Sequence, residues 1–318
     1  MDTDNRLAIT VDVEDWYHVP AVTGSSFSEY EDVDAFFADW DREYDYLTEP
    51  THRLLDLFDR SDVRATFFVV ADVVENYPGL VEEIAARGHE IGCHGRHHAC
   101  AVDPDTKEPR FDRREYERRI RDARERLADA TGRDVVGFRA PGAYVGGWVL
   151  DVLEDLSFRY DSSVSVNSLY NKTDSDLARV TSEPYVPERG RLTPGGDRDL
   201  VEFPWPYYEV AGVKLPTAGG PFLRFLGSVP IRKGLRQSLR RGDTLFYVHP
   251  LDIARESFPV VGNSRRRPAY WSFAGRTTER RLRTVLASFK EDRLATLSEL
   301  DERARRGESA AVPPGVGR

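Results

Sequence analysis

Short apolar runs alternate with amphipathic helical patterns along most of this chain. The runs LAITVDV at 7–13 and ATFFVV at 65–70 are apolar and β-branched, which is typical of buried parallel strands. Further short strands are expected at 90–93, 135–138, 159–164, 200–203 and 243–248. Leucine, alanine and arginine spacing predicts helices at 51–60, 80–87, 113–130, 148–156 and 277–290. This alternation predicts an α/β fold with a parallel sheet covered by helices, either open or closed into a barrel.

Clusters of polar residues follow several of these apolar runs. The first run ends in the acidic cluster Asp12, Glu14 and Asp15, and the run at 90–93 is followed by the histidine-rich turn HGRHH at 94–98. In α/β folds, active sites lie at the carboxyl ends of the parallel strands. The pattern therefore indicates an enzyme.

The histidine turn and the acidic cluster together predict a metal site. His94 and His98 are four residues apart, so on a helical turn both imidazoles lie on one face and can hold one transition metal. Asp12 and Glu14 share a face of their strand because side chains alternate, and Asp15 begins the loop that follows. Two histidines and one carboxylate form the ligand set of a catalytic zinc site that leaves a position open for water.

A closed structural zinc site is the alternative interpretation of the same turn. Cys93, His94, His98 and Cys100 could supply four ligands to such a site. This alternative leaves the acidic cluster at the end of the first strand unexplained, so the catalytic site is the preferred interpretation.

Length, charge and cysteine content narrow the class of protein. The chain has 318 residues, and its formal net charge of -9 argues against a nucleic-acid surface, which requires a basic excess. Two cysteines, no apolar run near the length of a membrane span and no signal sequence predict a soluble, cytoplasmic protein. The glycine- and proline-containing segment 305–318 is expected to be a disordered tail after a single domain at 1–304.

Six motifs occur in an order that resembles the polysaccharide deacetylases, the NodB-homology family of carbohydrate esterases (carbohydrate esterase family 4). They are TVDVEDW at 10–16, ATFFVV at 65–70, GHEIGCHGRHH at 88–98, FRAP at 138–141, YDSS at 160–163 and YVHP at 247–250. VEFPWP at 201–206 and the Gly219-Gly220 turn are similar to the branch of that family associated with exopolysaccharide systems. The resemblance covers 6–255, with 256–304 as a C-terminal helical extension, and implies a distorted (β/α) barrel with fewer than eight strands.

The resemblance also implies roles for residues in proton transfer. It makes Asp12 the catalytic base and Arg139 the cation that pairs with it. His249 resembles the general acid of the family, and Asp161 is expected to orient His249.

For the metal, the resemblance implies that His94 and His98 are ligands. In many family members an aspartate follows the base directly, but Val13 occupies that place here. Members with an Asp-Val-Asp pattern use the third residue, which maps to Glu14, whereas the next aspartate in this chain is Asp15. Glu14 is therefore the expected carboxylate ligand and Asp15 the alternative.

The expected function is a metal-dependent hydrolysis that removes N-acetyl groups from amino sugars of a polysaccharide or glycan precursor and releases acetate. Zn²⁺ is the expected metal, with Co²⁺, Mn²⁺ or Ni²⁺ as alternatives, and an N-acetylated glycan is the expected partner. Two other functions stay open. The chain could cleave a related amide or C–N bond in a lipid-linked sugar or cyclic ureide, or it could be a catalytically dead carbohydrate-binding protein.

Overall fold

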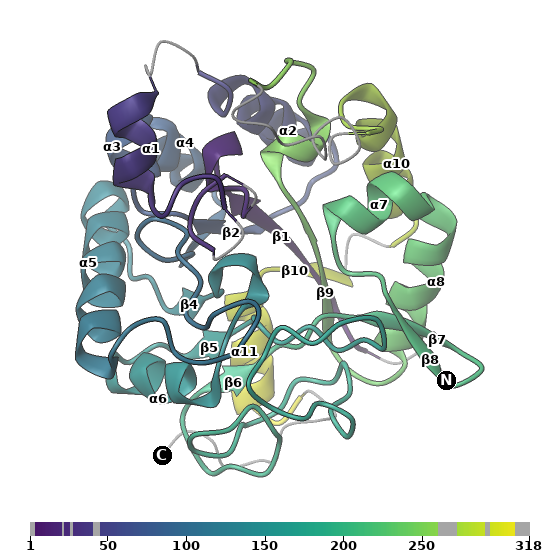
Figure 1. Cartoon of the computed structure of the whole chain (residues 1–318). Helices are drawn as coiled ribbons and strands as arrows, with labels where there is room; N and C mark the ends of the chain where they lie inside the picture. Colours follow the sequence, from purple (N-terminus) through teal and green to yellow (C-terminus); the bar gives the residue numbers. More distant parts are fainter. Residues whose placement is uncertain are drawn as a thin grey trace.

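A computed structural model describes residues 4–20, 22–25, 28–40, 45–259, 272–289 and 293–308, and its centre is a curled parallel sheet (Figure 1). The strands of this sheet are β1 (Leu7–Val13), β2 (Thr66–Val69), β3 (Glu90–Cys93), β4 (Gly137–Phe138), β5 (Tyr160–Asp161), β6 (Val201–Glu202), β9 (Thr244–Val248) and β10 (Leu294–Ala295). A separate antiparallel hairpin consists of β7 (Tyr207–Val210) and β8 (Val213–Pro216).

The strands form a distorted barrel around β1. Seven of them follow one another in the order β9-β1-β2-β3-β4-β5-β6. The eighth strand, β10, pairs with the first two residues of β1, on the edge of β1 that is not paired with β9. Strand β2 pairs with the later residues of that same edge, so β10 and β2 occupy one place in the circuit of strands. The expected distorted (β/α) barrel with fewer than eight strands around its axis is therefore confirmed.

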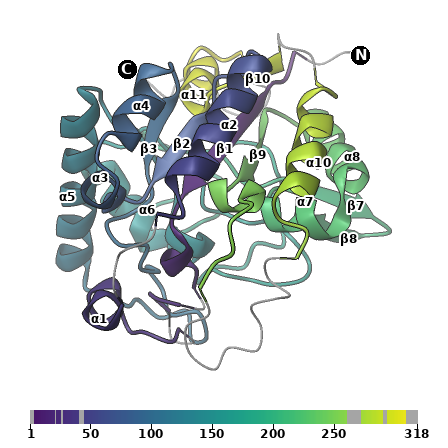
Figure 2. The ribbon, with the colours of Figure 1, turned by 90° about the horizontal axis from the view of Figure 1, so that it is seen from above.

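Helices cover the outer face of the sheet and lie at both ends of the barrel (Figures 1 and 2). They are α1 (Val33–Asp39), α2 (Thr48–Arg60), α3 (Val73–Asn76), α4 (Leu80–Ala86), α5 (Arg113–Thr131), α6 (Gly147–Asp155), α7 (Gly220–Leu226), α8 (Ser228–Leu239), α10 (Arg276–Leu286) and α11 (Leu297–Arg305). The described residues also include the short 3-10 helices η1 (Trp16–His18), η2 (Pro141–Ala143) and η3 (Pro250–Ile253). The expected strands and helices are all present, although several strands are shorter than expected. The hairpin β7–β8, α3, α7, α8 and β10 were not anticipated, and α1 lies in a stretch without clear periodicity. Helices α10 and α11 fall on the expected helical extension at 256–304.

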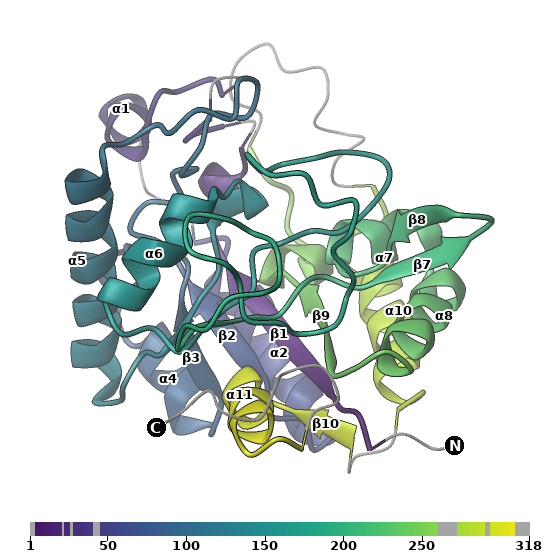
Figure 3. The same cartoon turned by 90° about the horizontal axis from the view of Figure 1, so that it is seen from below.

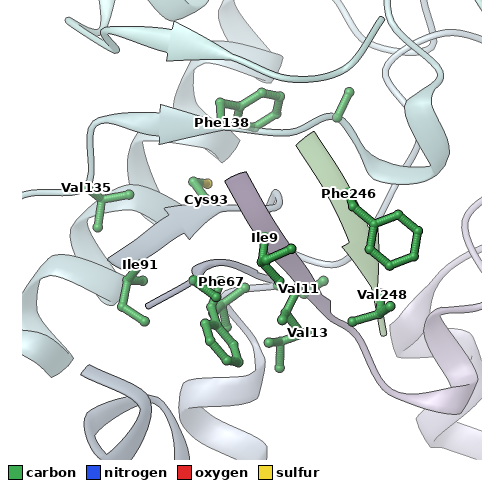
Figure 4. Close-up of a cluster of buried hydrophobic side chains, with 14 of the residues drawn as sticks. Ile9, Val11, Val13, Phe67, Ile91, Cys93, Val135, Phe138, Phe246 and Val248 are labelled. Carbon is green, nitrogen blue, oxygen red and sulfur yellow. The ribbon is translucent and has the colours of Figure 1, made fainter. Parts of the chain in front are cut away.

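Strand β1 is buried on both faces, and its two faces have different neighbours. Leu7, Ile9, Val11 and Val13 belong to the large cluster between the sheet and the helices, which Figure 4 shows. The alternate residues Ala8, Thr10 and Asp12 point to the barrel interior, because successive side chains of a strand project to opposite faces. One face of β1 therefore stabilises the fold, and the other delivers polar groups to the inside of the barrel.

The C-terminal extension covers the amino ends of the barrel strands, where β10 pairs with β1 and α11 follows (Figure 3). Leu297 and Leu300 of α11 lie in the same buried cluster as Ala8 and Phe68. The backbone N–H of Leu297 donates to Thr66 Oγ1 at 2.8 Å, at the first residue of β2. The carboxyl ends of the strands are left for the functional residues. Helix α11 reaches Arg305, and the part of the expected disordered tail from residue 309 lies outside the described residues.

We expect Phe246→Ala, in β9, to destabilise the protein by about 3–5 kcal/mol, since it removes a fully buried ring from the centre of the core. The matched control is Phe225→Ala, whose ring is 53% exposed and whose loss should change the free energy of unfolding by less than about 0.5 kcal/mol. Urea unfolding followed by circular dichroism measures both values. Equal losses for the two variants would contradict this description of the core.

Candidate active site

Polar side chains from four strands meet at the carboxyl end of the barrel. Asp12 lies near the end of β1, and Glu14 follows that strand directly. His94 follows β3, Arg139 follows β4 and His249 follows β9. Strands β9, β1, β2, β3 and β4 are parallel neighbours, so residues that are 235 positions apart in sequence come into contact here.

Glu14, His94 and His98 form a group that could hold a metal ion. One potential ligand atom from each residue lies within 4.8 Å of the others, and all three side chains are buried. Glu14 Oε2 is 2.5 Å from His98 Nε2 and 4.0 Å from His94 Nε2. His94 Nδ1–H donates to the carbonyl oxygen of Arg139 at 2.8 Å, which leaves Nε2 free to face Glu14. Such a second hydrogen bond is how metal-binding histidines are usually oriented.

The electrostatics of this group fit a divalent cation. Burial lowers the pKa of His94 to about 4, so its imidazole is neutral at neutral pH, as a metal ligand must be. Burial opposes ionisation of Glu14, but His98, His249 and His94 together hold the pKa of Glu14 well below its usual range. Both ring nitrogens of His98 are buried without a hydrogen-bond partner among the described residues, although Nε2 is close to Glu14. A carboxylate and an unsatisfied imidazole nitrogen converging in this way match the nitrogen and oxygen donors of zinc sites.

Asp15 faces a different environment from Glu14. Its carboxylate caps η1 by accepting from the backbone N–H of Trp16 at 2.7 Å, and it accepts a second hydrogen bond from the hydroxyl of Tyr77. Burial raises the pKa of Asp15 to about 6. Among the described residues, the ligand atoms that converge with His94 and His98 belong to Glu14 and not to Asp15.

The four residues of the alternative structural zinc site do not converge. Cys93 is part of the hydrophobic core, and burial raises the pKa of its thiol to about 12. Cys100 is also a buried free thiol, with a pKa raised to about 11 by burial. Neither sulfur joins His94 and His98 in a potential metal group within the part of the chain that is described, so this alternative is wrong.

Arg139 and Asp12 form the expected ion pair inside the barrel. Arg139 Nη1 is 2.6 Å from Asp12 Oδ1 and donates to Thr10 Oγ1 at 2.9 Å, and the whole side chain is buried. Its Nε and Nη2 donate to the carbonyl oxygen and hydroxyl of Ser162. The guanidinium also lies 4.3 Å from the ring centroid of Phe68. With its hydrogen bonds satisfied, the buried cation holds Asp12 in one position.

His249 lies between two carboxylates, that of Glu14 in the candidate metal site and that of Asp252. Its Nε2 lies 3.3 Å from Glu14 Oε1, and its Nδ1 lies 3.0 Å from Asp252 Oδ2. Asp252 Oδ1 is in turn 3.0 Å from Nε of the buried Arg224. Burial alone would lower the pKa of His249, but the carboxylates of Glu14 and Asp252 raise it to about 9. The imidazole is therefore protonated at neutral pH.

The expected pairing of Asp161 with His249 is wrong. Asp161 Oδ1 accepts from the hydroxyl of Ser163 at 2.6 Å, and Asp252 is the carboxylate beside Nδ1 of His249. Asp252 and Arg224 were both missed from the sequence. The segment HPLD at 249–252 carried a usable signal, because a histidine and an aspartate three residues apart after a strand can cap one helical turn reciprocally.

Family models match two successive parts of the chain. One described as Polysaccharide deacetylase matches residues 37–160, and one described as Domain of unknown function (DUF3473) matches residues 171–299. The first range contains His94, His98 and Arg139, and the second contains His249 and Asp252.

Two curated relatives are similar to this chain over part of their length. Peptidoglycan deacetylase of Helicobacter pylori is 28% identical over 167 residues, which are 49% of this chain and 52% of that protein. Peptidoglycan-N-acetylglucosamine deacetylase of Bacillus cereus is 26% identical over 118 residues, which are 36% of this chain and 52% of that protein. The matched part thus spans about half the length of these relatives.

Solved structures share the fold over nearly the whole chain. A putative polysaccharide deacetylase from Mycobacterium smegmatis has a TM-score of 0.64 and 21% identity, covering 100% of this chain and 95% of that one. The crystal structure of Puue Allantoinase has a TM-score of 0.58 and 13% identity, covering 96% of this chain and 91% of that one. At these identities the likeness concerns the fold alone.

We expect Glu14→Gln to weaken binding of Zn²⁺ by more than roughly tenfold, because the amide removes the negative charge from the ligand group. His94→Ala and His98→Ala should abolish binding at one equivalent per chain. Asp15→Asn is the matched control and should leave the affinity nearly unchanged, because its carboxylate is bonded to Trp16 and Tyr77. Titration calorimetry and elemental analysis measure affinity and content. A larger loss for Asp15→Asn than for Glu14→Gln would transfer the ligand role to Asp15.

Proposed function

We propose that this chain, which matches the Polysaccharide deacetylase family model over residues 37–160, hydrolyses the N-acetyl group of an amino sugar in a glycan and releases acetate. The observation that carries this proposal is the meeting of three groups at one end of the barrel. These are the pair of Asp12 with Arg139, the triad of Glu14, His94 and His98, and the pair of His249 with Asp252. A base, a metal site and a protonated imidazole are the parts that amide hydrolysis needs.

The proposed metal is Zn²⁺, held by Glu14, His94 and His98. When bound, a divalent cation of this kind acidifies water and polarises an acyl oxygen. The chain itself contributes the imidazole of His94, which is neutral because burial lowers its pKa to about 4, a second imidazole from His98, and the carboxylate of Glu14, which offsets part of the ionic charge.

Asp12 is the proposed general base. Its Oδ1 is held by Arg139 at 2.6 Å, so the carboxylate keeps one orientation while it takes a proton from the attacking water. Thr10 and Ser162 fix Arg139 in turn, which makes them positioning residues.

His249 is the proposed general acid. An amide nitrogen is a poor leaving group unless it is protonated, and His249 carries a proton at neutral pH because its pKa is raised to about 9. The C–N bond breaks as Nε2 of His249 gives its proton to the departing nitrogen. The products are acetate and a free amino sugar.

Acetate release from a panel of N-acetylated glycans, measured with and without a chelator, tests the proposed function. We expect release from at least one amino-sugar polymer or oligomer, loss of activity on chelation and recovery on adding Zn²⁺. No acetate from any member of the panel, despite bound metal, would favour the two alternatives. Binding without turnover would identify a carbohydrate-binding protein, and turnover of a ureide or formamide would identify a related C–N hydrolase.

We expect His249→Ala to lower kcat on an N-acetyl sugar by about a hundredfold to ten-thousandfold. The same variant should lose much less on an aryl acetate, because that leaving group needs less help from an acid. Asp12→Asn is the comparison and should lower kcat on both substrates, since both require activation of water. Equal damage to both reactions by His249→Ala would assign His249 a structural or binding role.

The rate should fall at alkaline pH as His249 loses its proton, because only the protonated form can act as the acid. Asp252→Asn removes a carboxylate that raises the pKa of His249, so the alkaline limb of the kcat profile should move to lower pH by roughly one unit. Asp161→Asn is the control and should leave the limb in place. Profiles that shift for Asp161→Asn and not for Asp252→Asn would contradict the observed pairing.

A further inference from the structure

The segments that contain α7, α8 and α10 carry an unusual excess of positive charge. Residues 220–241 and 272–289 contain one carboxylate, Glu279, and ten basic side chains, which are Arg224, Arg232, Lys233, Arg236, Arg240, Arg241, Arg276, Arg280, Arg281 and Arg283. Their formal charge is therefore +9 in a chain whose total is -9, so the remaining residues carry -18. These two stretches of an acidic chain are strongly basic, and of their cations Arg224 and Arg241 pair with carboxylates outside them, Asp252 and Glu209.

The exposed cations of this region form two outward-facing stripes. On α8 the stripe is Lys233, Arg236 and Arg240, and on α10 it is Arg276, Arg280 and Arg283. Spacings of three and four residues place the members of each stripe on one helix face. The buried residues of each helix lie on its opposite face. The helices are neighbours, since Arg232 Nη1 on α8 donates to Ser288 Oγ just after α10 at 3.1 Å. The two stripes therefore belong to one surface, which we call the basic face.

General arginine richness does not explain the basic face. Helix α5 is also rich in arginine, with seven, but it contains five carboxylates in addition. Its arginines form ion pairs, such as Arg119 with Glu115 at 3.0 Å and Arg126 with Asp122 at 2.9 Å. On the basic face only Arg283 makes an ion pair within the described ranges, with Glu279. The other five stripe cations are left to face solvent.

Exposed apolar side chains lie at the start of both stripes. Phe225, Leu226 and Val229, at the junction of α7 and α8, are 53%, 46% and 54% exposed, and Phe273, before α10, is 55% exposed. The rings of Phe225 and Phe273 are 6.4 Å apart, so the four side chains form one apolar tip. Solvent-exposed aromatic and aliphatic groups next to a cationic surface are typical of proteins that bind the interface of a membrane.

We propose that the apolar tip and the basic face dock this protein onto an anionic lipid surface. The tip would enter the headgroup region, and the stripes of α8 and α10 would lie over acidic headgroups. A lipid surface is favoured over an anionic polymer, because a polymer would use the cations but has no use for four exposed apolar side chains. The acidic remainder of the molecule would be repelled by such a surface, which sets the orientation of the protein.

The docking surface adjoins the candidate active site. Arg224 directly precedes Phe225 in the apolar tip and contacts Asp252, which contacts His249. A glycan attached to a lipid would therefore be presented on the side of the barrel that carries the proposed acid. This inference does not depend on the proposed chemistry, because lipid docking is measured without substrate.

Flotation with vesicles tests the proposal on the whole protein. We expect the protein to float with vesicles that contain phosphatidylglycerol and to dissociate from them as the salt concentration is raised. It should not float with vesicles of pure phosphatidylcholine. The triple variant Lys233→Glu, Arg236→Glu, Arg240→Glu should partition at least tenfold more weakly. The triple variant Arg114→Glu, Arg118→Glu, Arg121→Glu on α5 is the matched control, since it changes the net charge equally on the opposite side of the molecule (Figures 1 and 2).

The apolar tip is tested separately by Phe225→Ser, Leu226→Ser and Phe273→Ser together, which keep the charge constant. We expect this variant to lose several-fold in vesicle binding while circular dichroism and thermal unfolding stay unchanged, since the three side chains are exposed. The proposal is overturned if the wild-type protein does not bind anionic vesicles, or if the α5 control loses as much vesicle binding as the α8 variant. Binding to heparin or DNA that is insensitive to the tip variant, without vesicle binding, would assign the basic face to an anionic polymer instead.

Discussion

A single buried cation organises the candidate active site. Arg139 is completely buried at the centre of the barrel, where an unpaired charge would be very costly, so its guanidinium must be surrounded by acceptors. Asp12 and Thr10 on β1 and Ser162 after β5 supply them. The ring of Phe68 packs against the guanidinium plane. The ion pair is thus held by strands from both sides of the barrel.

The same residue also reaches the proposed metal ligands. The carbonyl oxygen of Arg139 accepts from Nδ1–H of His94, which turns the other ring nitrogen toward Glu14. One residue therefore positions the proposed base through its side chain and one histidine through its backbone. A change at Arg139 would disturb both groups at once, so its loss cannot be interpreted as the loss of one role.

Glu14 contacts both the proposed metal site and the proposed general acid. Its Oε2 faces His98 and its Oε1 faces His249, so one carboxylate lies between a proposed metal ligand and the proposed acid. The C-terminal half of the chain supplies the groups around the proposed acid, because Asp252 contacts Nδ1 of His249 and Arg224 contacts Asp252. This half matches a domain of unknown function and also carries α7, α8 and the basic face, so its elements serve the site and the proposed docking surface together.

Local patterns in the sequence were sufficient to predict several strands and the position of the candidate site. Apolar runs determine strands β1, β2, β3 and β9, and polar residues at the ends of β1, β3 and β9, namely Asp12, His94 and His249, already indicated where the site lies. Periodicity is a property of neighbouring residues, so it can be read without knowing the fold. The two-residue strand β10 carries too little pattern to be recognised, and it forms because β1 offers it a partner.

Only the tertiary structure decided which side chains meet. Glu14 and Asp15 are adjacent carboxylates in sequence, yet Glu14 turns toward His98 while Tyr77 and the start of η1 engage Asp15. Asp252, rather than Asp161, contacts His249, because that choice depends on how η3 leaves β9 and where α7 places Arg224. The basic face arises when α8 and α10, about forty residues apart in the chain, pack side by side. Contacts of this kind depend on where distant elements pack, and neither composition nor local periodicity contains that information.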